Sequence, residues 1–171
     1  MKLSDVQVII GGDAPTRMGA LMSGRIDATI LSPPHLTIVA KAGYRILADM
    51  GDMSANFTQS SLYVKGSSLK ENRDRVKRFL RGYAEAIHVI KTDRVRTMKV
   101  FAHRMRIDDP ETVRTTYEYF APRFSFPPRV NLDGVRDTIN FYAEQNPDFK
   151  NRKPEEFVDQ SLMDELDKEG F

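Results

Sequence analysis

The hydrophobic positions of the first fifty residues fall into short runs. Such runs occupy residues 6–10, 26–31 and 44–48, and the first of them ends at Gly11 and Gly12. Mainly apolar runs of this length, bounded by glycine or proline, are typical of buried strands. The pattern therefore predicts three strands in this part of the chain.

Segments whose apolar residues have helical spacing separate these runs. Asp13 is a favourable N-cap, Pro15 suits a first turn and Gly24 suits a helix end, which predicts a helix between the first two runs. A second helix is predicted over residues 34–42, with Gly43 as its stop. Strand, helix, strand, helix, strand at this spacing predicts parallel strands joined by right-handed crossovers.

The pattern changes after the polar residues 51–61. One more short strand is predicted at residues 62–65, and beyond it nearly all apolar positions follow the helical period. Ser68 and Glu71 have the spacing of a capping box, which predicts the start of a long helix. Three later helices and some short helical turns are predicted, over about residues 93–105, from Asp109–Pro110, and before Asn146–Pro147.

The second part of the chain is predicted to have several amphipathic helices and almost no strand. Each helix has a single apolar stripe, as Val76, Leu80 and Ile87 illustrate, and a helix that lies on a sheet has such a stripe. Either these helices pack on one another as a bundle, or strands from elsewhere supply a sheet. We favour the second alternative, and the predicted fold class is α/β.

Composition narrows the function classes. The 171 residues suit one domain or two small lobes, and no apolar run approaches the roughly 18 residues of a membrane span. The first ten residues lack the pattern of a secretory signal. Twenty-six basic and 24 acidic residues are close to balance, and the absence of cysteine removes disulfides and thiolate chemistry. We therefore expect no nucleic-acid partner.

The chain contains no motif of an enzyme or a cofactor site. Dinucleotide-binding, P-loop, zinc-protease and nucleophile-elbow patterns are all missing from the sequence. His35, His88 and His103 have no partner at the spacing that metal ligation requires. The basic residues of the long helix, between positions 70 and 81, are interrupted by acidic ones and predict a solvated helix face. We expect no catalytic residue, no metal and no cofactor.

Candidate ligand contacts lie in three loops. In open parallel sheets, ligands bind beyond the carboxyl ends of the strands, and loops rich in glycine, proline and hydroxyl residues follow the predicted strands. A third, polar loop joins the two parts of the chain. The candidate ligand-binding residues are Gly12, Asp13, Ala14, Thr16, Ser32, Pro33, His35, Thr58 and Gln59.

Several stretches of the sequence together resemble a known family. They are A-L-x-S-G-x-I-D-A at residues 20–28, I-L-S-P-P at 30–34, G-Y-R-I-L-A-D at 43–49, R-V-K-R-F-L-R-G-Y-A-E-A-I at 75–87 and E-L-x-x-x-G-F at 165–171. In this order and spacing the chain resembles the solute-binding proteins of ABC importers, in the nitrate/sulfonate/taurine and thiamine-precursor (NMT1/THI5-like) group. The likeness extends over nearly the whole chain.

The resemblance implies a periplasmic-binding-protein-like type II fold with two α/β lobes, of which this chain corresponds to the C-terminal half. Residues 1–57 would form a partial second lobe. Residues 58–62 would cross between the lobes, and residues 63–171 would be the mostly helical C-terminal portion of the first lobe.

The resemblance also implies a function: a small-molecule binding component of an ABC-type importer, with the ligand in an inter-lobe cleft. The ligand would be a polar or anionic organic molecule or a heteroaromatic one, the partner would be the transporter permease, and the location would be periplasmic or otherwise extracytoplasmic. Two alternatives remain. One is an enzyme of the same fold family that makes a pyrimidine or thiamine precursor. The other is a stand-alone regulatory domain, a homo-oligomer whose partner copy supplies the missing lobe.

Overall fold

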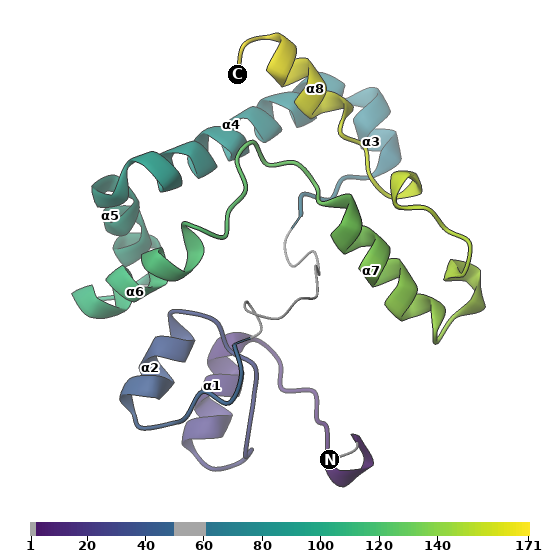
Figure 1. Ribbon diagram of the computed structural model, residues 1–171. Helices are drawn as coiled ribbons and strands as arrows, with labels where there is room; N and C mark the ends of the chain where they lie inside the picture. The colour runs from purple at the N-terminus through teal and green to yellow at the C-terminus, as the bar shows by residue number, and fades with distance from the viewer. Residues whose placement is uncertain (1–2, 50–60) are drawn as a thin grey trace. The chain divides into compact units, whose positions relative to one another are not determined.

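The computed structural model describes residues 3–49 and 61–171, and every regular element within these ranges is helical (Figure 1). Two compact units are present, one of residues 1–48 and 94–121 and the other of residues 49–93 and 122–171. No helix in the described ranges combines the length and the hydropathy that a bilayer-spanning segment needs. The elements are η1 (Leu3–Asp5), α1 (Ala14–Met22), α2 (His35–Lys41), α3 (Gly66–Glu71), α4 (Arg73–Thr92), α5 (Arg94–Met105), α6 (Pro110–Phe120), α7 (Leu132–Ala143), η3 (Pro147–Phe149), η4 (Pro154–Glu156) and α8 (Ser161–Lys168).

The predicted α/β fold with parallel strands is wrong for the described residues. All four predicted strand segments lack a β-ladder, and most of their large apolar side chains are exposed. A helix pairs its backbone groups within itself, whereas a strand needs a neighbour for them. The apolar runs indicate a preference for strand, but no second strand lies beside any of them within residues 3–49 and 61–171.

The predicted helices are largely confirmed. Asp13 caps α1 by accepting a hydrogen bond from the Thr16 backbone N–H at 3.0 Å, and Asp109 caps α6 in the same way from Thr112 at 2.9 Å. The capping box at Ser68 is wrong, because Ser68 lies inside the separate helix α3. The long helix α4 begins only after Asn72, where the chain leaves the helical conformation.

In the first unit, α2 packs against α6 and α5 packs against α6. The Thr37 and Thr115 hydroxyls lie 3.2 Å apart, and Lys41 forms an ion pair with Asp109 at the start of α6. Val39 and Val113 are buried. The contact between α2 and α6 joins residues that are about seventy positions apart, so it holds the two sequence segments of this unit together.

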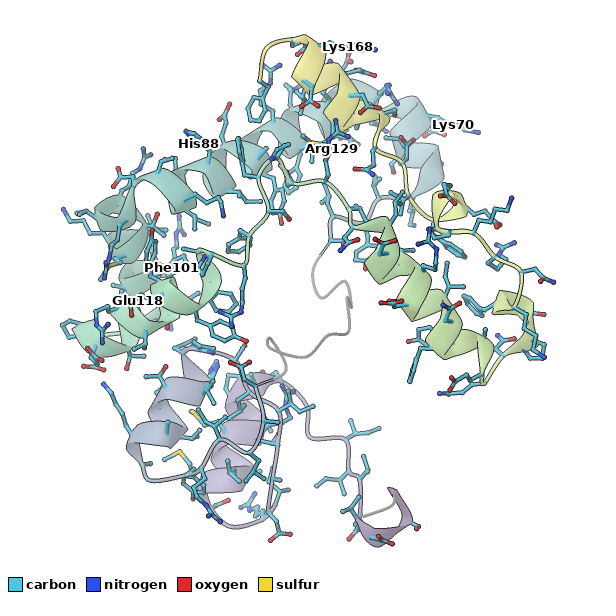
Figure 2. The ribbon with its side chains drawn as sticks, viewed as in Figure 1. Lys70, His88, Phe101, Glu118, Arg129 and Lys168 are labelled. Atoms are coloured by element: carbon cyan, nitrogen blue, oxygen red, sulfur yellow. The ribbon has the colours of Figure 1, made fainter. Side chains whose placement is uncertain are left out.

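In the second unit, α8 lies along α4 (Figure 1). Ala84 and Ile87 of α4 and the fully buried Leu166 of α8 belong to the apolar core of this unit. Arg129, from the chain between α6 and α7, also holds α8 through Asp164 at 2.9 Å and Asp167 at 2.5 Å (Figure 2). The C-terminal helix is therefore fixed from two sides.

The prediction of a solvated basic face on α4 is only partly right. Two carboxylates, Glu165 of α8 and Glu169 at its C-cap, contact three cations of α4. Glu165 accepts from Arg73 Nε at 3.0 Å and from Lys77 at 2.9 Å, and Glu169 pairs with Lys77 and Arg81. These contacts lower the pKa of Glu165, through Arg73 first and then Lys77, and raise the pKa of Lys77. The sequence of α4 by itself does not show that a distant segment places carboxylates beside its cations.

Replacing Asp109 with Asn should make the protein less stable in a pH-dependent way. Hydrogen bonding to Lys41 and to Thr112 holds the pKa of the Asp109 carboxyl far below its usual range. The stabilisation is therefore complete above the unfolded-state pKa of about 3.9 and disappears as the pH falls toward the folded-state pKa. The difference in unfolding free energy between wild type and Asp109→Asn, measured by urea titration, should be larger at about pH 7 than at about pH 3.

Asp108→Asn is the matched control, because Asp108 is exposed and has no ion pair within the described chain. It should change the unfolding free energy little at either pH. An equal loss for Asp109→Asn at both pH values would contradict the ion-pair account.

Candidate functional site

The first candidate loop is built around the start of α1. Asp13 adopts an extended backbone conformation and caps the helix with its side chain, and Pro15 occupies the first turn. Gly12 has a φ of 73°, in the left-handed region that glycine adopts at little cost. The chain thus turns sharply from the apolar run at residues 6–10 into the helix, which exposes Gly12 and Asp13 at the turn.

Arg17 holds this loop against the second one. Its guanidinium donates hydrogen bonds to the Gly12 carbonyl oxygen and, at 3.4 Å, to the Ile30 carbonyl oxygen. A Cβ atom on Gly11 would lie only 2.8 Å from Arg17 Cγ, so glycine is needed there for the arginine side chain to pass. Sequence reasoning missed Arg17, although its place four residues after the Asp13 cap was a usable signal.

The second candidate loop runs from Ser32 to His35. Pro33 is buried, Ser32 and His35 are half-buried, and the Ser32 carbonyl oxygen accepts from the Leu36 backbone N–H at 3.1 Å. The Ser32 hydroxyl has no hydrogen-bond partner within the described chain and is not enclosed. This hydroxyl is therefore available to a ligand.

The two loops influence each other electrostatically. The Thr16 hydroxyl and backbone N–H lower the pKa of the Asp13 carboxyl most, and the charges of Arg17 and His35 lower it further. Asp13 is consequently ionised throughout the neutral range, and His35 lies near enough to act on it. The surface presents a carboxylate, a guanidinium with N–H groups to spare, an imidazole and a free hydroxyl.

The structure therefore brings seven of the nine predicted ligand contacts into one unit. Arg17 ties the segment containing Gly12, Asp13, Ala14 and Thr16 to the chain leading into Ser32, Pro33 and His35. Thr58 and Gln59 lie outside the described residues. That these residues contact a ligand stays a prediction. No group of three or more metal-ligating side chains occurs in residues 3–49 and 61–171.

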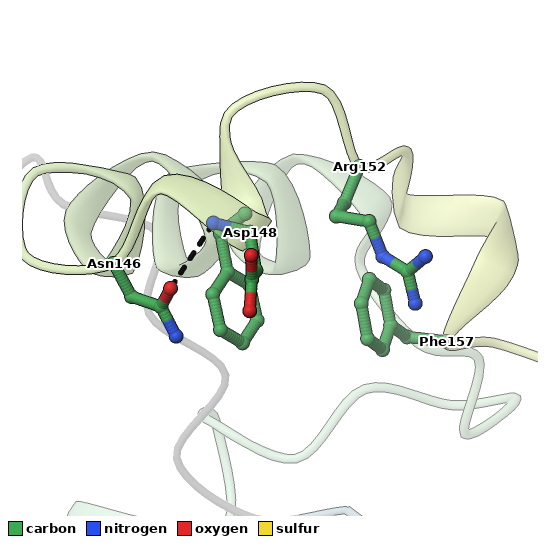
Figure 3. Close-up of a pocket in the computed structure, with 5 residues that line it drawn as sticks. Asn146, Asp148, Arg152 and Phe157 are labelled. Atoms are coloured by element: carbon green, nitrogen blue, oxygen red, sulfur yellow. Dashed lines mark hydrogen bonds between the residues drawn. The ribbon is translucent and has the colours of Figure 1, made fainter.

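A pocket of about 520 Å³ lies elsewhere, near the end of α7, with Asn146, Asp148, Phe149, Arg152 and Phe157 around it (Figure 3). The rings of Phe149 and Phe157 are nearly parallel, with centroids 6.4 Å apart, and the Arg152 guanidinium lies 5.3 Å from the Phe157 centroid. The Asn146 side chain accepts from the Asp148 backbone N–H at 3.0 Å. The residues that line the pocket are mostly exposed, and Arg152 already pairs with Glu156. These contacts serve to hold the short helices η3 and η4 beside α7.

Comparison with known proteins bears differently on the loops joined by Arg17 and on the pocket near Phe149. A family model described as NMT1/THI5 like matches residues 1–94. This range includes both loops joined by Arg17 and excludes the pocket near Phe149. No curated protein and no solved structure gives a significant match to the chain. We take the loops around Arg17 as the candidate functional site, because they bring polar side chains together within the matched range.

Two glycine substitutions near this site should have opposite effects. Gly12→Ala should lower the free energy of unfolding by about 1 kcal/mol, because alanine resists a φ of 73°. Gly19→Ala should raise it by about 0.5–1 kcal/mol, because Gly19 is inside α1 with no atom within 4 Å of an added Cβ. Chemical denaturation of both variants and of wild type measures these two changes in unfolding free energy. A shift of the same sign in both would contradict the turn geometry at Gly12.

Proposed function

Because this chain belongs to the NMT1/THI5-like family, we propose that it is the solute-binding component of an ABC-type importer. In this proposal the chain binds a small molecule at the loops joined by Arg17 and delivers it, unchanged, to a membrane permease. An extracytoplasmic location is part of the same proposal.

The observation that carries the proposal is the clamp made by Arg17. By donating to the Gly12 and Ile30 carbonyl oxygens it links the first loop to the segment that leads into the second, and both lie inside the range of the family match. A preformed site loses little conformational entropy when a ligand binds. The free hydroxyl of Ser32 and the ionised carboxylate of Asp13 give such a site polar specificity.

Charge at the site narrows the ligand class. Asp13 repels a purely anionic ligand such as nitrate and favours an ammonium or a ring N–H. Arg17 keeps N–H groups beyond the two that its carbonyl contacts use, and these favour a sulfonate, a carboxylate or a ring nitrogen. The best fit is therefore a small zwitterion or an amino-substituted heteroaromatic ring.

A second candidate, an enzyme that makes a pyrimidine precursor, has one observation in its favour. The charge of His35 contributes to the lowered pKa of the Asp13 carboxyl, so the site contains an imidazole and a carboxylate, two side-chain types that general acid–base catalysis uses. Recovery of the bound molecule after long incubation separates the two functions. A carrier returns the solute unchanged by mass spectrometry, whereas an enzyme returns a product.

Ser32→Ala should weaken ligand binding about tenfold while leaving the melting temperature of the free protein nearly unchanged, because the lost hydroxyl has no partner in the described chain. Taurine, nitrate, an aminopyrimidine and an aromatic carboxylate are suitable probes. A ligand at a hundred times its Kd should stabilise the protein by about 2.7 kcal/mol, which thermal unfolding detects. Ser67→Ala, at an exposed serine of α3, is the control and should bind as wild type. Equal affinity in both variants would remove Ser32 from the site.

Asp13→Asn isolates the effect of charge at the site. Asparagine caps a helix as well as aspartate does, so α1 should remain intact. Removal of the carboxylate charge should strengthen binding of nitrate and weaken binding of an ammonium-bearing probe, each about two- to fivefold. Titration calorimetry with both probes measures the change. Equal changes in affinity for nitrate and for the ammonium-bearing probe would show that Asp13 lies away from the ligand.

A further inference from the structure

The pocket near Phe149 is formed by one continuous stretch of the second unit. Its lining residues all fall within residues 146–157, and this stretch packs on α7 through η3 and η4. The shape of the pocket therefore does not depend on the placement of the two units. Its volume of about 520 Å³ is within the range of pockets that hold small molecules.

Short-range hydrogen bonds hold the walls of this pocket. The Phe149 backbone N–H donates to the Asn146 carbonyl oxygen at 3.2 Å, and the Arg152 backbone N–H donates to the Phe149 carbonyl oxygen at 3.2 Å. On the other wall, the Phe157 backbone N–H donates to the carbonyl oxygen of the buried Pro154 at 3.0 Å. Walls fixed in this way lose little conformational entropy when a ligand binds.

Two phenyl rings form the apolar part of the pocket. The planes of Phe149 and Phe157 differ by 14°, and their centroids are 6.4 Å apart. Phe157 is 49% exposed and Phe149 is half-buried, so neither ring is enclosed by its neighbours. A flat ring can lie against both phenyl rings at the separation of about 3.5 Å at which carbon atoms pack. The apolar part of the pocket therefore favours a planar ligand.

The polar part of the pocket contains a free carboxylate. The Asp148 side chain has no hydrogen bond or ion pair with any residue of 3–49 and 61–171, whereas Arg152 pairs with Glu156 at 3.1 Å. The Asn146 side chain uses its oxygen to accept from the Asp148 backbone N–H, which leaves its NH₂ group as a donor. In Figure 3, Asn146 and Asp148 lie on one side of Phe157 and Arg152 lies on the other. The unneutralised charge of the lining residues is therefore negative.

We propose that this pocket binds a planar aromatic cation, with its ring against Phe149 and Phe157 and its N–H groups donating to the Asp148 carboxylate. A cation is attracted both by the faces of aromatic rings and by a carboxylate, so one charged group gains from both walls. A ligand that carries a carboxylate or phosphate would be repelled by Asp148. This site is separate from the loops joined by Arg17 and does not rest on the proposed solute-binding function.

Benzamidinium is the probe for this site, because it is flat, cationic at neutral pH and has its N–H groups on one edge. Benzamide and benzoate have nearly the same shape but are neutral and anionic. Titration of the isotope-labelled full chain with each probe, followed by the backbone amide NMR signals of residues 146–157, measures a Kd of up to about 1 mM. Benzamidinium should bind at least about threefold more tightly than benzamide, and benzoate should bind most weakly.

Substitutions separate the aromatic contribution from the charge. Phe157→Leu should weaken benzamidinium binding about three- to tenfold, whereas Phe157→Tyr keeps the flat ring and should bind within about twofold of wild type. Asp148→Asn should weaken it about two- to fivefold and remove the preference over benzamide. Phe79→Leu is the matched control, because Phe79 is 61% exposed on α4 and lies outside the pocket. If Phe157→Leu fails to fold, Phe157→Tyr and the comparison of the three probes still test the site.

Saturating shifts of the amide signals of residues 146–157, weakened by Phe157→Leu and by Asp148→Asn but not by Phe79→Leu, support the proposal. Absence of saturation at these amides overturns it, as do equal affinities for the three probes. Shifts confined to Gly12, Ser32 and their neighbours would also overturn it, because the probe would then bind at the loops joined by Arg17. Since the test is read at residues 146–157, its failure leaves the proposed solute-binding function intact.

Discussion

Every peptide group in a folded chain needs a hydrogen-bond partner, and this requirement shapes the whole structure. A helix meets it with residues four positions apart, so helices form wherever caps and apolar spacing allow. A strand meets it only through another strand. Within residues 3–49 and 61–171 the chain has many helix caps and no paired strands, and its regular structure is therefore entirely helical.

The candidate site depends on a substitute for a sheet. In an open α/β sheet, neighbouring strands hold their C-terminal loops in register. Here the side chain of Arg17 does so, because it reaches the carbonyl oxygens of both Gly12 and Ile30. The glycine at position 11 leaves room for that side chain. Two loops thus remain together without any strand pairing in the described chain.

Charge has different roles in the two units. In the second unit, Glu165 and Glu169 each contact two cations of α4, and this network fixes the direction of α8 over an apolar contact. Because all these groups are partly solvated, the pairs contribute modestly to stability and mainly to orientation. In the first unit the carboxylate of Asp13 remains exposed beside Arg17 and His35, where it can act on a ligand.

Sequence alone located most helices of this protein, because caps such as Asp13 and Asp109 act over three residues and are visible in any short window. It also indicated the family, since the motifs that carry the resemblance are contiguous, whereas ligand contact by Gly12, Asp13 and Ser32 stays a prediction. It failed on the sheet, because an apolar run such as residues 6–10 shows what a segment prefers and not whether a partner is present.

Only the tertiary structure revealed contacts between distant residues. These include the bond from Arg17 to Ile30, the ion pair between Lys41 and Asp109, and the neutralisation of α4 by α8. Such contacts depend on how helices pack in space, and no local pattern encodes their partners. For this chain, local hydrogen bonding determined the elements, and long-range packing decided which of their side chains meet.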